Sequence, residues 1–360
     1  MRLILLLVII YGLTMALPGP ELMDFGSFMA SGQAAGQGLD PYGIYPLTFR
    51  VELPGFNSWN PNLNPPPSLP LFHLLSRLEP AFAFRLWWAI SAVCYCAAVA
   101  LLARRGWLAV LWAFALAGFW DSLVLGQIYL PLVLATVAAW CLLERDRVWS
   151  AGLLIGLVVA VKPNFTVWPA LLLMAGHYRP VMAAMVSAAL LAGFAVLLYG
   201  PQVYGQWLAL VLNDANRAVF LTNASLSGLA QRLGVPSLGT LSSLGLLAWL
   251  AWWAWRRRLP VLQASALGLV GAVLASPIAW VHYTLFLLPI FFAFPATPLL
   301  VLSAALLVVP VPLVLHLLEA PWWLQASLGS VYGWAVVLCL LALRPLPKTE
   351  VAAACKDGAR

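Results

Sequence analysis

Long apolar runs alternate with short polar segments along nearly the whole chain. A membrane helix needs about 20 apolar residues, so the pattern predicts about twelve membrane segments, several of them shorter than a full span. They lie near residues 3–17, 81–103, 107–124, 128–143, 149–161, 163–176, 180–199, 237–255, 260–275, 283–294, 296–314 and 323–343. The pair broken at Lys162-Pro163 is either two short helices or one interrupted pass. The predicted fold class is therefore all-α, as a polytopic integral membrane protein.

A long polar loop follows the first apolar run and extends from Pro18 to about Pro67. Irregular backbone finds no hydrogen-bond partners in hydrocarbon, so this loop must lie at the membrane surface. Within it, residues 24–39 are predicted to form an interfacial helix of small residues, which Asp24 could cap. The sequence Asp40-Pro41-Tyr42-Gly43 predicts a turn, and residues 68–79 a surface helix.

Charged residues make up only 9% of the chain, against roughly 25% in soluble domains, which supports the membrane assignment. The net charge of +7 comes from short basic clusters between apolar runs and not from a basic stripe, which argues against nucleic-acid binding. The clusters follow the positive-inside rule, and we expect both termini to be cytoplasmic. The clusters assigned to the cytoplasmic face are Arg104-Arg105, Arg145/Arg147, Arg179, Arg256-Arg257-Arg258 and the Lys348/Arg360 tail.

This topology predicts one transmembrane domain, residues 1–345, with external loops at about 18–80 and 200–236 and a cytoplasmic tail at 346–360. The expected location is the inner (plasma) membrane, with the functional site on the external or periplasmic side. Residues 2–17 could instead be a signal peptide, but the later segments need a first helix to set their orientation.

The five cysteines do not indicate a disulfide framework or a zinc site. Cys94 and Cys96 would point about 200° apart on a helix, which is poor geometry for a shared metal. No metal and no cofactor are expected.

Ionisable residues near hydrocarbon are costly and are therefore functional candidates. Asp24, Asp121, Gln127, Lys162 and His282 fall near helix ends on the predicted external face. Each has a simpler explanation, as a helix cap, a turn residue, a counter-ion or an interfacial polar group. Together they supply a carboxylate that could act as a general base and groups that could stabilise a phosphate. This set predicts transfer from a lipid-linked phosphate donor, and the chain contains no Walker, Rossmann, HExxH or GxSxG motif.

An ordered series of short motifs resembles the polyprenyl-phosphate-mannose-dependent α-1,2-mannosyltransferases of glycosyltransferase family 87, which have the multi-spanning GT-C fold. The series covers most of the chain up to about residue 290, and no single piece is specific. It consists of Asp24-Phe25, Gly38 to Tyr42 (GLDPY), Pro65-Pro66-Pro67, Gly126-Gln127, Gly152 to Pro163 (GLLIGLVVAVKP), Asn223 to Arg232 (NASLSGLAQR) and Ser276 to His282 (SPIAWVH).

The resemblance implies an inverting glycosyltransferase with Asp24 as the catalytic base. Its partners would be a polyprenyl-phosphate sugar, a lipid or glycan acceptor and the bilayer. Lys162, His282, Gln127 and Arg232 would then lie near the donor phosphate or sugar. The residues that would shape the acceptor side or the loop over the site are Asp40, Tyr42, Asn64, Asp121, Asn223 and Trp280. Asn64, Tyr129 and Tyr283 stand where the family often has Tyr, Asn and His, so the sequence does not identify the sugar or the acceptor.

Two other classes of protein compete with this interpretation. A transporter or lipid flippase would also have broken helices and an intramembrane lysine. Against it, no inverted repeat is seen and the polar loops gather on one predicted face. A membrane acyl- or phosphotransferase would need a His–Asp pair, for which His73 is the candidate histidine.

Overall fold

The computed structural model describes residues 2–19, 21–53, 56–103, 106–213 and 215–343. The predicted tail at 346–360, Cys355 and the Arg104-Arg105 pair lie outside these residues. The N-terminal part consists of α1 (Arg2–Ala16), α2 (Met23–Gly36), β1 (Phe49–Leu53), β2 (Phe56–Asn60), η1 (Pro66–Ser68) and α3 (Leu69–Leu75).

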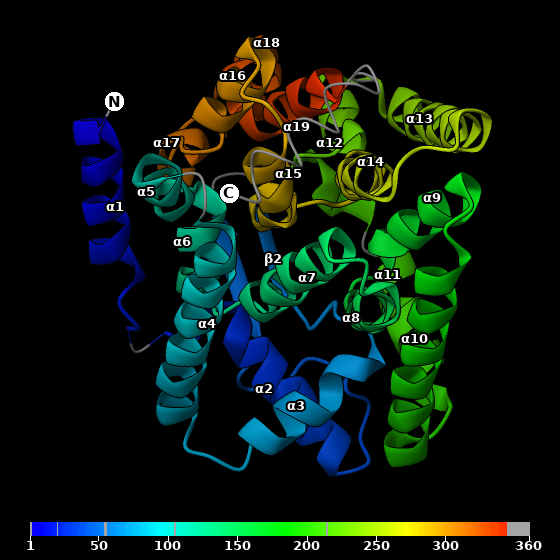
Figure 1. The fold of residues 1–360 in the computed structure, drawn as a ribbon. Helices are drawn as coiled ribbons and strands as arrows, with labels where there is room; N and C mark the ends of the chain where they lie inside the picture. Colours follow the sequence, from blue (N-terminus) through cyan, green and yellow to red (C-terminus); the bar gives the residue numbers. More distant parts are fainter. Residues whose placement is uncertain (1, 20, 54–55, 104–105, 214, 344–360) are drawn as a thin grey trace.

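The remaining elements are helices that form the body of the molecule (Figure 1). The central ones are α4 (Pro80–Leu102), α5 (Trp107–Ala115), α6 (Ala117–Leu125), α7 (Tyr129–Glu144), α8 (Val148–Val161), η3 (Pro163–Thr166), α9 (Val167–Ala175), α10 (Tyr178–Tyr199), α11 (Gln202–Asn213), η4 (Ala215–Val219), α12 (Leu226–Arg232), α13 (Pro236–Arg257) and α14 (Val261–Leu274). The last ones are η5 (Val281–Leu287), α15 (Leu288–Ala293), α16 (Pro298–Leu306), α17 (Val311–Leu315), α18 (Trp322–Ala326), η6 (Leu328–Ser330) and α19 (Val331–Ala342).

Four helical stretches in the described part of the chain are long and apolar enough to cross a membrane: Pro80–Leu102, Tyr178–Tyr199, Pro236–Arg257 and Trp322–Ala342. Helices α5 and α6 meet at a 46° bend and add a fifth if they form one broken span. Most other predicted segments are apolar helices of 10–17 residues. The structure therefore agrees with a helical membrane protein but does not show twelve full spans.

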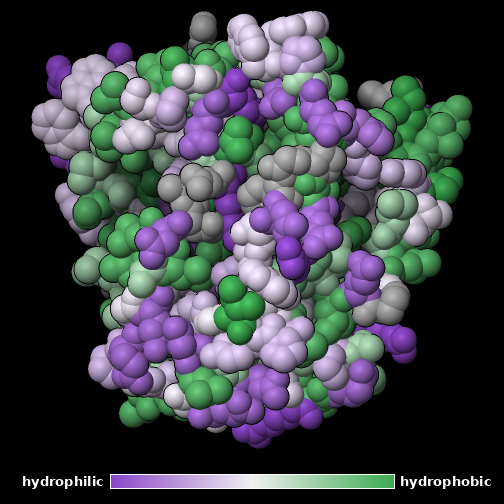
Figure 2. All heavy atoms as spheres, turned by 180° about the vertical axis from the view of Figure 1, so that it is seen from behind, coloured by the Kyte–Doolittle hydropathy of each residue, from purple (hydrophilic) through white to green (hydrophobic). Residues whose placement is uncertain are grey.

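Large apolar side chains on the outside of the bundle support the membrane assignment. Helices α10 and α13 expose Leu, Val, Met, Phe and Trp side chains, among them Leu190, Leu197 and Trp252. Seen from behind, hydrophobic residues are prominent on both sides of the upper half, and hydrophilic residues cover the lower end and parts of the middle and top of this face (Figure 2). Contact with lipid explains such a surface, because soluble monomers rarely expose continuous apolar patches of this extent.

Two glycines one helical turn apart let α8 and α10 pack closely. A Cβ on Gly152 would lie 2.3 Å from the carbonyl oxygen of Pro180, and one on Gly156 equally close to that of Ala184. This small-xxx-small spacing brings membrane helices together where water provides no driving force. After α8 the helix ends at Val161 and resumes as η3 and α9, so the Lys162-Pro163 break gives two short helices.

The polar loop after α1 is folded into the body of the protein. Helix α2 is almost entirely buried, and Gly32 allows the α3 backbone near Phe72 to approach it. Phe72 is fully buried whereas Leu71 and Leu74 are exposed, so α3 is a surface helix with one face packed into the core. The all-α prediction missed the antiparallel hairpin β1–β2, in which Phe49 pairs with Asn60 and Arg50 with Trp59.

Candidate active site

A cavity of about 570 Å³ opens between α1, α2, the hairpin, α6 and α17. Its apolar wall includes Val8, Tyr11, Gly12 and Met15, which share one face of α1 because they are spaced at helical intervals. Gly12 brings α1 close to α6, since a Cβ there would lie 2.3 Å from the Trp120 ring. The polar residues of the cavity include Glu21, Asp24, Arg50, Glu52, Asn60, Asp121, Arg217, Thr222 and His282.

Asp24 lies in the first turn of α2 and is 6% exposed. Its Oδ1 accepts a hydrogen bond of 2.6 Å from Asn60 Nδ2, and its Oδ2 accepts one from Gln127 Nε2. No side chain caps α2, so the carboxylate serves this network and not the helix end. The preceding residue, Met23, has φ of 50°, a left-handed conformation that is strained for a side chain of this size.

Burial raises the pKa of the Asp24 carboxyl to about 7, because the charged form loses its hydration. The hydrogen bond from Asn60 opposes this effect, as do the positive charge of Arg217 and the hydrogen bond from Gln127. The negative charge of Asp121 adds to the effect of burial. A carboxyl with a pKa near neutrality is well matched to proton transfer at physiological pH.

Asn60 and Arg217 belong to the site although the sequence analysis did not select them. Asn60 Oδ1 accepts a hydrogen bond from Arg217 Nη1, and Arg217 Nη2 donates to the Trp59 carbonyl at 2.6 Å. Asn60 therefore links the Asp24 carboxylate to a buried guanidinium that lines the same cavity. The sequence gives no signal for Arg217, because it lies in a polar loop, where a charged residue is ordinary.

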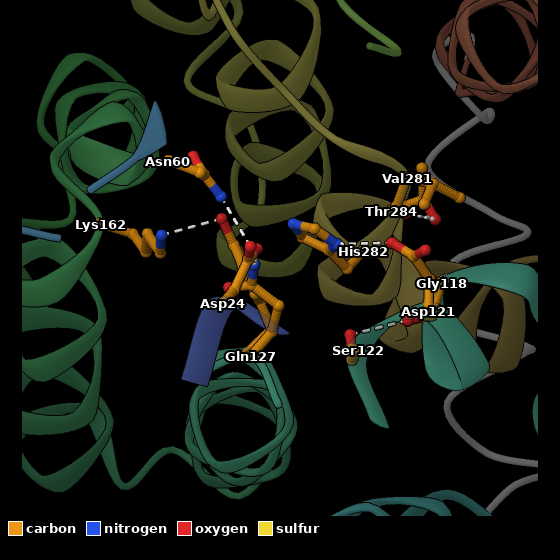
Figure 3. A network of polar contacts seen from close by, with 11 residues as sticks. Asp24, Asn60, Gly118, Asp121, Ser122, Gln127, Lys162, Val281, His282 and Thr284 are labelled. Atoms are coloured by element: carbon orange, nitrogen blue, oxygen red, sulfur yellow. Dashed lines mark hydrogen bonds and ion pairs between the residues drawn. The ribbon is translucent and has the colours of Figure 1, made fainter. Parts of the chain in front are cut away.

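His282 of η5 and Asp121 of α6 both line the cavity, and their side chains face each other (Figure 3). His282 Nδ1 lies 3.0 Å from Asp121 Oδ2, and the histidine is 2% exposed. The imidazole ring packs on Tyr129, with 4.1 Å between ring centroids.

Lys162 lies behind the cavity wall, next to Tyr129. Its Nζ donates a hydrogen bond of 2.8 Å to the Tyr129 hydroxyl and lies 4.2 Å from the centre of that ring. Neither Lys162 nor Gln127 lines the cavity. Lys162 can therefore act on a ligand through its charge or after a rearrangement, and Gln127 through its hydrogen bond to Asp24.

Asn223 and Arg232 tie loops together and do not line the cavity. Asn223 Oδ1 accepts from the backbone N–H of Ala279 at 2.9 Å. Arg232 donates to Ser330 Oγ at 2.6 Å and to the carbonyls of Phe220 and Asn223 at 2.8 and 2.9 Å. The Arg232 bond fixes the backbone of Phe220, and the Asn223 bond fixes the residue before Trp280. Both Phe220 and Trp280 line the cavity.

Three predicted site residues form a separate cluster. Asp40 Oδ1 accepts from the Tyr42 backbone N–H at 2.9 Å, and the Tyr42 hydroxyl donates to the Asn64 carbonyl at 3.2 Å. The cluster packs beside α11, and none of the three side chains lines the cavity. Among the described residues, no group of three His, Cys, Asp or Glu side chains is arranged to hold a metal ion.

The sequence model of glycosyltransferase family 87 matches residues 62–277, well over half of the chain. The match includes Asp121, Gln127, Lys162 and Arg217, whereas Asp24, Asn60 and His282 lie outside it. No curated protein and no solved structure matched. The chain belongs to glycosyltransferase family 87.

Proposed function

We propose that this glycosyltransferase transfers mannose from a polyprenyl-phosphate donor to a hydroxyl of a lipid-linked or glycan acceptor, with inversion and with Asp24 as the general base. The observation that carries the proposal is the position of Asp24. Its buried carboxylate lines a cavity that combines polar residues, among them Asp121 and Arg217, with apolar side chains of α1, α6 and α17. A lipid-linked sugar likewise combines a polar head with a long apolar chain.

The cavity also offers a cation for the donor phosphate. Arg217 is 7% exposed, lines the cavity and is joined to Asp24 through Asn60. A guanidinium has five N–H donors in a planar arrangement that suits phosphate oxygens. In a poorly solvated site its charge stabilises an anion more strongly than it would in water. Lys162 adds positive charge from behind Tyr129.

In the proposed reaction the acceptor hydroxyl oxygen attacks the anomeric carbon of the donor sugar. The bond from that carbon to the phosphate oxygen breaks, and its electron pair stays on the phosphate, which gains negative charge. The hydroxyl proton passes to Asp24, which must therefore be ionised beforehand. Attack from the face opposite the leaving phosphate inverts the anomeric configuration. No cofactor is needed to balance these steps.

The proposed site faces the external or periplasmic side of the plasma membrane. The turn after α7 carries Arg145 and Arg147, and the end of α13 carries Arg256 to Arg258; the positive-inside rule assigns such basic clusters to the cytoplasm. Single cysteines at Arg257 and Ser58 should react with a membrane-impermeant reagent from opposite sides. Labelling of both from one side contradicts this topology.

The function is tested with the purified full chain in proteoliposomes. Polyprenyl-phosphate [¹⁴C]mannose is supplied with lipid extracts and mannosyl glycosides as acceptors, and the matching glucose donor is tested in parallel. Label should move from the donor to an acceptor, with mannose preferred. If the labelled donor crosses the bilayer intact and no transfer occurs, the chain is a flippase and the proposal fails.

A further inference from the structure

One buried polar atom at the cavity has no hydrogen-bond partner among the described residues. This atom is Nε2 of His282, whose other ring nitrogen faces Asp121 at 3.0 Å. The histidine lines the cavity, and its ring extends from Asp121 toward Asp24 (Figure 3). Buried polar atoms are nearly always paired, so an unpaired one at a cavity wall indicates a place for a ligand.

Asp121 determines what Nε2 can bind. An ionised carboxylate only accepts hydrogen bonds, so the proton that joins the pair must be on Nδ1 of the imidazole. In the neutral ring Nε2 then carries a lone pair and is an acceptor.

The groups around the ring are Asp121 from α6, the Tyr129 and Tyr283 phenols, Lys162 beyond Tyr129, and Asp24 from α2 on the side away from Asp121 (Figure 3). Full burial favours the uncharged ring, because an imidazolium would lose its hydration there.

An acceptor at Nε2 excludes a phosphate oxygen as its partner, because phosphate oxygens are acceptors as well. We propose that Asp121 and His282 form a hydroxyl-binding subsite, in which His282 Nε2 accepts a hydrogen bond from a sugar hydroxyl. Asp121 is the positioning residue that holds the required tautomer. This proposal rests on the proposed glycosyl transfer and assigns His282 to a hydroxyl, whereas the sequence analysis placed it near the donor phosphate or sugar.

The hydroxyl belongs either to the donor sugar or to the acceptor, and binding measured without acceptor separates the two. The probes are polyprenyl-phosphate mannose and its 2-, 3-, 4- and 6-deoxy forms, titrated against the purified full chain in nanodiscs. For a donor hydroxyl, one deoxy form should bind wild-type protein about tenfold more weakly, the usual cost of one buried hydrogen bond. The His282→Ala variant should bind this deoxy form and the parent donor with equal affinity. For an acceptor hydroxyl, donor binding is unchanged and the same pattern appears in KM with deoxy acceptors.

Asp121→Asn should weaken the preference for that hydroxyl without abolishing binding, since an amide can hold either tautomer. Ser122→Ala is the matched control on the same helix, because Ser122 Oγ donates only to the Gly118 carbonyl at 2.7 Å. The control should keep the full preference. If every deoxy compound loses the same factor in wild type and in His282→Ala, the subsite does not exist.

A second measurement is independent of any ligand. The ¹⁵N shifts of His282, assigned by comparison with His282→Ala, should show a protonated Nδ1 and a bare Nε2 at neutral pH. Asp121→Asn should mix the two tautomers. A protonated Nε2 in the wild type overturns the proposal. If wild-type protein neither binds nor uses polyprenyl-phosphate mannose, the proposed function fails, whereas the tautomer result still stands.

Discussion

Replacing Asp24 with Asn removes the proposed general base and keeps the shape of the side chain. Both carboxylate oxygens of Asp24 accept hydrogen bonds from amide groups, those of Asn60 and Gln127. An Asn side chain has one acceptor oxygen, so one of these two N–H groups would face another donor. Leaving one buried donor unsatisfied costs about 1–3 kcal/mol of stability. Loss of a general base costs about 10²–10⁴-fold in turnover.

The two effects are separated by a reciprocal exchange. Asp24→Asn combined with Gln127→Glu restores a donor–acceptor pair between α2 and the turn that joins α6 to α7, but moves the carboxylate from α2 to that turn. The double variant should regain the thermal stability of the wild type and remain at least 100-fold less active, by the same general-base estimate. Stability is read from thermal unfolding in detergent, and activity from transfer of labelled mannose in proteoliposomes.

The reasoning is refuted if Asp24→Asn keeps more than about a tenth of wild-type turnover, which is far above the residual rate expected without a base. Recovery of activity in the double variant would also refute it, because activity would then follow stability and not the position of the carboxylate.

Four further results are expected. Burial raises the pKa of Asp24 to about 7 and the ionised form is the base, so a pH–rate profile should show turnover rising through about pH 7. Asn60→Leu removes a hydrogen bond that lowers this pKa, so the rise should move to higher pH in that variant. Arg217→Gln should weaken donor binding about 10- to 100-fold, with Arg217→Lys intermediate, measured by titration in nanodiscs. Lys162→Met should lower kcat with little change in thermal stability, and an unchanged kcat would make Lys162 a structural counter-ion. Arg232→Met should reduce the folded yield and the unfolding temperature, because two buried carbonyls lose the guanidinium that donates hydrogen bonds to them. A variant that folds normally but binds the polyprenyl-phosphate sugar weakly would instead support the predicted contact between Arg232 and that substrate.

The sequence predicted the helical framework well where hydrophobicity alone determines structure. The break at Lys162-Pro163 follows from proline chemistry, and the structure has two short helices there. The number of full spans was not predictable in the same way, because helices shorter than about 20 residues do not reveal from composition whether they cross a membrane.

The sequence analysis missed the hairpin although its pattern was readable. Phe49-Arg50-Val51-Glu52-Leu53 alternates apolar and charged residues, as a half-buried strand does. The alternation is short and lies in a loop rich in Asn and Pro, whose composition favours irregular structure. This hairpin brings Asn60 to Asp24, so the missed element carries a residue of the site.

Ionisable residues near the ends of apolar runs pointed toward the site more reliably than loop motifs did. Asp24, Asp121 and His282 line one cavity and Lys162 lies behind its wall, whereas Asp40, Tyr42 and Asn64 form a cluster elsewhere. Charge near hydrocarbon is costly and therefore marks function, but an Asp-Pro turn is common in any loop. Arg217 came to the site only through tertiary packing, which single-sequence reasoning does not contain.

The anomeric configuration of the product tests the central claim most directly. Polyprenyl-phosphate mannose labelled with ¹³C at C1 is supplied to the purified chain, and the ¹³C–¹H coupling of the product distinguishes the two anomers. Direct transfer by an acceptor hydroxyl with Asp24 as the base predicts a mannoside of the configuration opposite to that of the donor. A product with the donor's own configuration, or no mannoside at all, contradicts the account.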